Sequence, residues 1–164
     1  MARSRNPSER SLDRIDRRIL RALQQDGRMA YVDLAERVGL STSPCLERVR
    51  RLEREGYILG YHARVDAQKV GAGLLIYAEI SLNYSRPDIF ESFREALRDY
   101  PEVQECHLVS GDFDYLLKVR VGDMEAYRDL LGRLLKAQPG MVRDSRTLVV
   151  MEEGAETLAV AIPD

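Results

Sequence analysis

Four arginines, Arg48, Arg50, Arg51 and Arg54, lie close together in the sequence, and Glu47 comes just before them. Guanidinium groups bind phosphate through charge-assisted hydrogen bonds, and a carboxylate can accept a hydrogen bond from a base amine. These side chains therefore indicate contact with nucleic acid, although arginine and glutamate also occur on ordinary solvated helix faces.

The apolar residues of the same stretch predict the helix that carries the arginines. At about 100° per residue, one face holds Cys45, Leu46, Val49 and Leu52, and the charged residues fall opposite or on the flank. Ser41, Thr42 and Ser43 offer N-cap oxygens, and Pro44 suits the first helical position. The recognition helix of a DNA-binding domain places its first residues at base edges and its basic residues near the DNA backbone. We therefore expect base contacts from Ser43, Pro44, Glu47 and Arg48, and phosphate contacts from Arg50, Arg51 and Arg54.

Two further helices are predicted before this one. Leu34, Ala35 and Val38 mark a short helix, and Gly39 after it suits the left-handed residue that ends many helices. An amphipathic helix is expected over residues 11–26, with Ser11 as its N-cap and Gly27 closing it. A β-like run at residues 57–65 would form a wing or a strand leading out. The pattern is that of a helix-turn-helix DNA-binding domain.

Charge divides the chain into two parts. Residues 1–64 hold 14 Lys and Arg against 9 Asp and Glu, net +5, whereas residues 65–164 hold 11 against 18, net −7. Attraction to phosphate should come from the first part, since the second would repel DNA. No apolar run approaches the roughly 20 residues of a membrane span. Cys45 and Cys106 are expected to be buried, reduced thiols, and no metal site is predicted.

The second part predicts strands and helices in the order β-α-β-β-α-β. Strands are expected over residues 74–82, 103–109, 115–121 and 146–151. Helices are expected after Pro87, with Phe90, Phe93 and Leu97 on one stripe, and from Met124 to Leu135. This order is the ferredoxin-like plan, with both helices on one face of an antiparallel sheet. The other face would have no helix to cover it, so self-association is expected there. Residues 156–162 could add an edge strand.

The whole pattern resembles the Lrp/AsnC (feast/famine) family of transcriptional regulators, and looks closest to its leucine-responsive branch. The resemblance rests on LDRIDRRILRALQQDGR, VGLSTSPCLERVRRLEREG, ECHLVSGDFDYLLK and TLVVMEE. It implies an α+β protein with an N-terminal winged helix-turn-helix domain and a C-terminal ferredoxin-like sensory domain. It also implies double-stranded DNA and a free amino acid as partners, no cofactor, and dimers that assemble further, commonly to octamers.

The resemblance also implies an effector site between dimers, around the hairpin that joins the middle strands. The matching positions here are Leu108, Gly111, Asp112, Asp114, Met124, Leu148, Val149 and Val150. Backbone N–H groups of a turn can bind a carboxylate, and a nearby acid can bind an ammonium group. The simpler alternative is that Gly111 and Asp112 form only a hairpin turn, for which that pair is ordinary.

The expected organisation is therefore a disordered basic arm (1–10), a winged helix-turn-helix domain (11–60), a linker strand and hinge (61–73) and an effector-binding and oligomerisation domain (74–164). The expected function is regulation of transcription by sequence-specific DNA binding that leucine or another apolar amino acid modulates, in the cytoplasm on the nucleoid. An amino-acid-regulated enzyme is one alternative, but it would need a catalytic domain that this chain lacks. An architectural DNA protein without an effector is the other.

Overall fold

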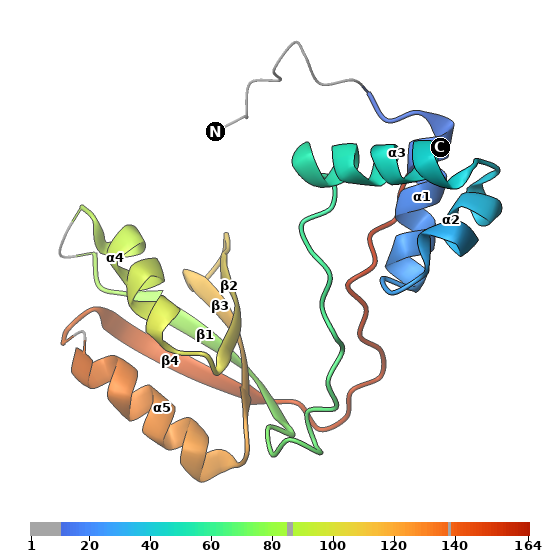
Figure 1. Ribbon diagram of the computed structural model, residues 1–164. Helices are drawn as coiled ribbons and strands as arrows, with labels where there is room; N and C mark the ends of the chain where they lie inside the picture. The colour runs from blue at the N-terminus through green and yellow to red at the C-terminus, as the bar shows by residue number, and fades with distance from the viewer. Residues whose placement is uncertain (1–10, 85–86, 138) are drawn as a thin grey trace. The chain divides into compact units, whose positions relative to one another are not determined.

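The structure is a computed structural model that describes residues 11–84, 87–137 and 139–164 (Figure 1). It forms two compact units. The first contains the residues up to Arg64 together with Glu156–Asp164, and the second is Val65–Ala155. The last segment thus belongs with the first unit, whereas the sequence placed it in the second. The arm predicted at residues 1–10 lies outside the described residues.

Three helices build the first unit: α1 (Arg14–Gln25), α2 (Tyr31–Val38) and α3 (Thr42–Arg54). Their apolar faces meet in one core, of which Ile19, Leu34, Val49 and Leu52 are fully buried. The N-cap of α1 is Asp13, not Ser11 as predicted. The reason is a reciprocal capping box, in which the Asp13 carboxylate accepts the N–H of Asp16 at 2.8 Å and the Asp16 carboxylate accepts the N–H of Asp13 at 3.0 Å.

The turn between α2 and α3 follows the prediction, except at Pro44. Gly39 has φ 77° and ends α2 in the left-handed conformation that favours glycine. Ser41 is the N-cap of α3 but makes no side-chain cap hydrogen bond, and Pro44 is the third helical residue rather than the first. Proline is tolerated there because the N–H groups of the first helical turn have no partner within the helix.

The strand predicted within residues 57–65, and again as a linker strand in 61–73, is absent. Residues 57–65 contain no helix or strand, and residues 67–71 form a turn. A strand requires a neighbour for its N–H and C=O groups, and none of the described segments of the chain pairs with this one. Residues 57–65 therefore have the composition of a strand but do not form one in the single chain.

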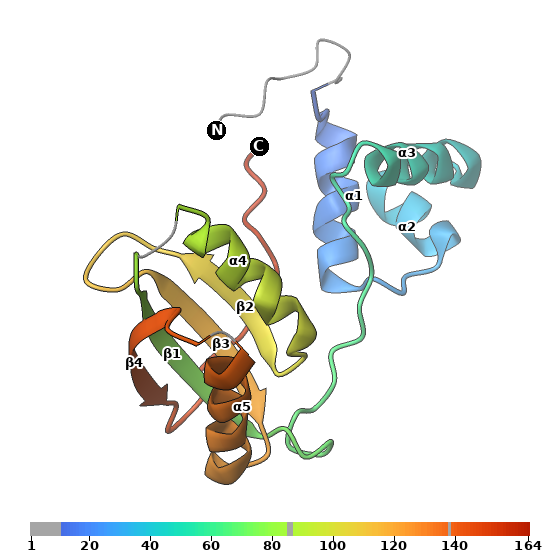
Figure 2. The same cartoon turned by 90° about the vertical axis from the view of Figure 1, so that its left-hand side faces the viewer.

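The second unit has the predicted βαββαβ order, which confirms the fold class. Its elements are β1 (Leu74–Leu82), α4 (Ile89–Ala96), the 3-10 turn η1 (Leu97–Asp99), β2 (Val103–Leu108), β3 (Tyr115–Val121), α5 (Met124–Ala137) and β4 (Val142–Val149). The antiparallel sheet has the order β2-β3-β1-β4, and α4 and α5 lie on the same face of it (Figure 2). Alternate residues of β1 and β3 fill the core between sheet and helices, including Ile76, Ile80 and Leu117.

Strand β4 begins four residues earlier than predicted and ends two earlier. It is an edge strand, and residues 143–149 are all exposed. Its first residues are polar and show no alternation of apolar and polar residues, which is the pattern that predicts a strand. The second edge strand expected at 156–162 does not form, because these residues contact α1 instead.

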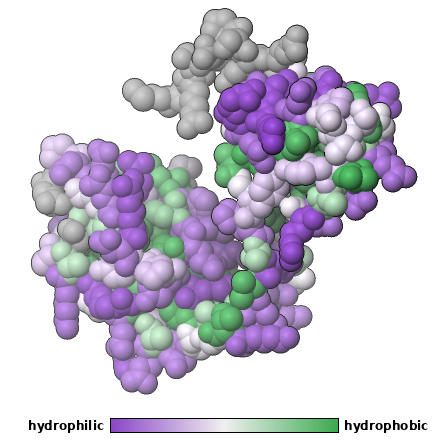
Figure 3. Space-filling model, in the orientation of Figure 1, coloured by the Kyte–Doolittle hydropathy of each residue, from purple (hydrophilic) through white to green (hydrophobic). Residues whose placement is uncertain are grey.

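The face of the sheet opposite the helices carries mixed side chains. Tyr77 and Leu116 lie among charged neighbours, of which Lys118 pairs with Glu105 at 3.2 Å. Figure 3 presents a different side of the molecule, on which hydrophobic residues are also scattered among hydrophilic ones. The open face is therefore amphipathic rather than a continuous apolar patch.

Candidate DNA-binding interface and effector site

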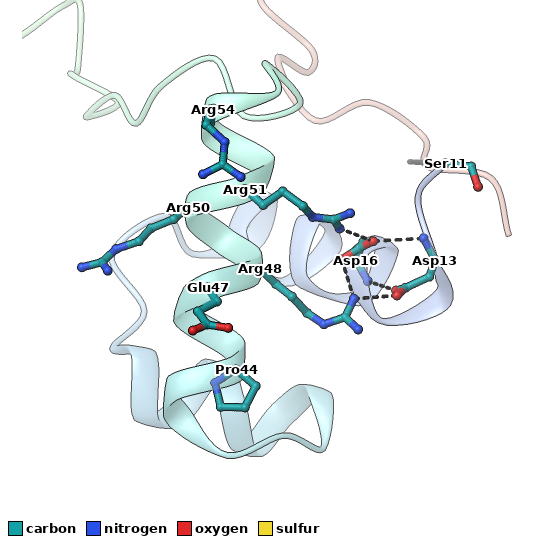
Figure 4. Close-up of a pocket in the computed structure, with 9 residues that line it drawn as sticks. All are labelled: Ser11, Asp13, Asp16, Pro44, Glu47, Arg48, Arg50, Arg51 and Arg54. Carbon is teal, nitrogen blue, oxygen red and sulfur yellow. Dashed lines mark hydrogen bonds and ion pairs between the residues drawn. The ribbon is translucent and has the colours of Figure 1, made fainter. Parts of the chain in front are cut away.

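Helix α3 presents one apolar and one polar side. Cys45, Val49 and Leu52 are buried in the core, while Glu47 and Arg50 are exposed on the outer side. A shallow hollow of about 840 Å³ runs from this outer side toward the start of α1 (Figure 4). It is lined by Ser11, Asp13, Asp16, Pro44, Glu47, Arg48, Arg50, Arg51 and Arg54.

Two of the predicted DNA-binding arginines are engaged inside the unit. Arg48 contacts Asp13 at 2.6 Å and Asp16 at 2.8 Å, and Arg51 contacts Asp16 at 2.5 Å. Figure 4 shows both guanidinium groups turned toward α1. Asp16 is fully buried, so its charge requires these partners. Both arginines therefore join α3 to α1, and their expected contacts with a base and with a phosphate stay predictions.

The other predicted residues face outward. Ser41, Thr42, Ser43, Pro44, Glu47, Arg50 and Arg54 are all exposed. Figure 4 shows Arg50 pointing away from Arg48 and Arg51. Among the described residues, neither Arg50 nor Arg54 has an ion-pair partner, so both guanidinium groups are available for phosphate.

Asp13 and Asp16 were not predicted as site residues, although they organise the site. The sequence signal was their spacing of three at a helix start, which is the spacing of a capping box. That signal indicates a cap, but it does not indicate that both carboxylates also bind arginines from α3.

The first unit should lose stability in acid because of Asp13. Burial raises the pKa of Asp13, but the hydrogen bonds from the Asp16 N–H and from Arg48 outweigh burial and lower that pKa to about 2. A lowered pKa means that the stabilisation is complete above the unfolded value near 3.8 and is lost as the pH falls from there through about 2. We expect the denaturant midpoint, followed by circular dichroism, to fall over this range.

Asp13→Asn should lower the midpoint at neutral pH and flatten its dependence between pH 4 and 2. Asp33→Asn, which changes an exposed carboxylate on α2, serves as the control. If the parent and Asp13→Asn keep the same difference in midpoint at every pH, the Asp13 carboxylate does not stabilise the fold.

The predicted effector residues fall into two groups at opposite ends of the sheet. The hairpin group is Leu108, Gly111, Asp112 and Asp114, and it lies beside Ile80 and Leu82 at the end of β1. In the other group, Leu148 pairs with Tyr77, Val149 pairs with Ile76, and the N–H of Val150 donates to Leu75, all near the start of β1. Met124 follows the end of β3, which pairs there with Leu74. At about 3.4 Å per residue, the two ends of β1 are too far apart for one amino acid to touch both.

Asp114 holds the hairpin to the neighbouring strand. Its carboxylate accepts the N–H of Leu82 at 2.7 Å and a short hydrogen bond from the Tyr84 hydroxyl, and its own N–H donates to Ile80. The bond from Tyr84 to Asp114 raises the pKa of the Tyr84 phenol. Both carboxylate oxygens are thus engaged within the unit, which differs from the free acceptor that the sequence suggested.

Asp112 is exposed at the tip of the hairpin, after Gly111 at φ 141°. Within the described part of the chain, no hydrogen bond or ion pair involves its side chain. Leu108, the last residue of β2 before the hairpin, is 61% exposed. The hairpin therefore presents an exposed carboxylate at its tip and an exposed apolar side chain where it begins.

Metal binding has no geometric support in the residues described. No group of three or more His, Cys, Asp or Glu side chains is arranged for a metal there. Cys45 is buried as predicted, whereas Cys106 is only partly buried. Across the same residues, no helix combines the length and apolar character that crossing a bilayer requires.

Two domain families match the sequence along most of its length. The Lrp/AsnC ligand binding domain matches residues 75–160, and a winged helix-turn-helix DNA-binding domain matches residues 12–58. The leucine-responsive regulatory protein of Escherichia coli (strain K12) is 58% identical over 153 residues, which are 93% of each chain. The chain belongs to the Lrp/AsnC family. It is therefore a DNA-binding transcriptional regulator with a ligand-binding domain.

Other Lrp/AsnC proteins agree in sequence and fold. The leucine-responsive regulatory protein of Serratia marcescens is 60% identical over 144 residues, 88% of this chain and 87% of that protein. The crystal structure of an AsnC family transcriptional regulator from Agrobacterium tumefaciens matches with TM-score 0.86 and 37% identity, covering 92% of this chain and 97% of that one. A Neisseria meningitidis transcriptional regulator in complex with L-methionine matches with TM-score 0.86 and 34% identity over the same shares.

Proposed function

We propose that this regulator binds duplex DNA through the outer side of α3 and that a free apolar amino acid, such as leucine or methionine, modulates its DNA binding or assembly. The observation that carries the proposal is the exposed side of α3. On it, the guanidinium groups of Arg50 and Arg54 remain without an ion-pair partner among the described residues, and Glu47 is exposed as well. Relatives that are leucine-responsive or bind L-methionine support the choice of ligand. The chain would then act on the cytoplasmic nucleoid, with neither a cofactor nor a catalytic step.

A thermal-shift screen of the twenty amino acids is the first test. A ligand that binds only the folded chain raises its apparent stability, and the active amino acid is then added to a DNA titration. A rise in Tm together with a change in DNA affinity or assembly supports the proposal. If DNA binding is tight but no amino acid changes either measurement, the chain is an architectural DNA protein.

The ligand's ammonium group would be bound by Asp112 rather than by Asp114. Asp112 is exposed and unengaged, whereas Asp114 already accepts two hydrogen bonds. The predicted effector residues at the other end of the sheet, which include Met124 and Leu148, would be supplied to the same ligand by a second copy of the chain. The arrangement is thus complete only in an assembly.

Asp112→Asn should weaken amino-acid binding, measured by calorimetry. Losing a charge-assisted hydrogen bond costs about 1.5–3 kcal/mol, which is roughly a 10- to 100-fold rise in Kd. Asp114→Asn is the matched comparison, and should lower stability by about 1 kcal/mol with little effect on ligand affinity. The opposite ranking of the two variants would place the ammonium group at Asp114.

Self-association would use the open face of the sheet. Leu116 lies on that face opposite Glu79 and His107, away from α4 and α5. We propose a dimer through this face and further assembly to an octamer. A dimer would also match the two-fold symmetry of paired DNA half-sites.

Leu116→Glu should therefore dissociate the dimer. An unpaired carboxylate buried in an interface costs several kcal/mol, so the dimer Kd should rise by roughly 100-fold or more. Sedimentation at micromolar concentration measures this. Arg128→Glu on the exposed side of α5 is the control. A Leu116→Glu protein that sediments like the parent would exclude this face.

A further inference from the structure

The segment Glu156–Asp164 follows the ligand-binding domain in the chain but packs on the DNA-binding unit. Figure 1 shows it ending beside α1. Ile162 packs against the core formed by the three helices, whereas Leu158 is 87% exposed. The segment is therefore fixed to the unit by one apolar anchor rather than by general burial.

Two side chains of α1 hold the backbone of this segment. The Gln24 amide donates to the Val160 carbonyl at 3.1 Å and accepts the Val160 N–H at 2.7 Å. Arg21 donates to the Ile162 carbonyl at 2.7 Å and to the Asp164 carboxylate at 2.6 Å. Gln24 thus satisfies both backbone groups of one residue, as a neighbouring strand would.

The same segment is joined directly to the end of β4. The Val150 N–H donates to Leu75 at 3.0 Å, and the chain then runs from Met151 to Ala155 into the docked segment. On the other side, α1 holds α3 through Asp16, Arg48 and Arg51. Covalent bonds and specific contacts thus connect the end of β4 with the helix that faces DNA.

We infer that residues 156–164 are a latch through which the ligand-binding domain controls α1, and with it the presentation of α3. A ligand bound near the end of β4 changes the relative free energies of the docked and released latch, and so shifts their populations. Release removes the Ile162 contact and the four hydrogen bonds that join the segment to α1. The role of the latch in the ligand response rests on the proposed amino-acid effector. The docking of the latch on α1 does not depend on that proposal.

The first experiment tests docking in the full chain. Ile162→Ser should lower the Tm of the helical unit by at least about 4 °C, and Leu158→Ser, at an exposed position of the same segment, should leave it unchanged. Gln24→Ala should speed hydrogen exchange at the Val160 amide several-fold, because its acceptor is removed. Equal Tm values for the two serine variants, with unchanged exchange at Val160, would overturn docking.

The second experiment tests control of DNA binding, using leucine as the probe. Ile162→Ser and a chain without residues 156–164 should bind leucine within about twofold of the parent by calorimetry. Their DNA affinity should change less than about twofold on adding leucine, while the parent and Leu158→Ser respond fully. A full response in both altered chains would overturn the role of the latch in signalling.

The two proposals fail in different ways. A parent chain that binds DNA but no amino acid overturns the proposed effector and, with it, the signalling role of the latch. The Tm and exchange measurements still decide whether residues 156–164 are docked on α1, because neither requires a ligand.

Discussion

Asp16→Asn should unfold the DNA-binding unit well below the melting temperature of the parent. Asp16 is fully buried and receives Arg48, Arg51 and the N–H of Asp13. Removing one partner of a buried ion pair costs about 3–5 kcal/mol, and the partial exposure of both arginines places this case near the lower end. A loss of about 3 kcal/mol corresponds to a fall in Tm of roughly 10–20 °C for a unit of this size.

Calorimetric scanning of the full chain, with DNA binding measured below and above the new transition, tests this expectation. Glu36→Gln, which neutralises an exposed carboxylate of α2, should melt like the parent. DNA binding by Asp16→Asn should persist at low temperature and vanish as the unit melts. An unchanged Tm with lost DNA binding would instead assign Asp16 a role at the DNA surface.

The second large effect is expected from the double variant Arg50→Ala/Arg54→Ala. Each phosphate contact contributes about 0.9 to the slope of log affinity against log salt, so the double variant should lose about two units of slope. Its affinity for specific and random duplex should fall together, by roughly 100-fold, since phosphate contacts carry no sequence information. Fluorescence anisotropy over a salt series, on a duplex selected by the parent and on a random duplex, measures both quantities.

Two single variants serve as comparisons on the same helix. Glu47→Ala should change the preference between duplexes more than the total affinity, because a carboxylate near DNA is favourable only where it accepts a donor such as cytosine N4. Arg51→Ala should lower stability and leave the salt slope unchanged, since Arg51 is engaged with Asp16. A slope that falls for Arg51→Ala but not for the double variant would reverse the assignment of the arginines.

Strong periodicity explains which elements the sequence could predict. The bounds of β1 and β3 agree with the prediction because every second residue is buried against the helices. Strand β4 was misplaced because its early residues are polar and exposed at an edge. The strand expected after α3 is absent because a local pattern reports only preference, whereas a strand also needs a partner for its backbone.

The candidate sites were harder to predict, since contacts between distant residues decide them. A helical projection places Arg51 on the charged side of α3, but it contains no information about Asp16 on α1. Likewise, the sequence gives Asp112 and Asp114 as a similar pair, and only the tertiary contacts of Leu82 and Tyr84 distinguish them. Residue type and spacing thus predict an interface on α3, and the partners within the fold determine which of its side chains remain free.

Neutralising Arg48 and Arg51 within the protein has a consequence for the search through a genome. The outward side of α3 offers two guanidinium groups and one carboxylate, so its attraction to arbitrary phosphates is weaker than four arginines would give. Weak attraction to random sequence shortens each unproductive residence and leaves more molecules free to find an operator. Competing sites outnumber true operators by many orders of magnitude. Finding an operator therefore depends on the ratio of specific to non-specific affinity more than on the specific affinity alone.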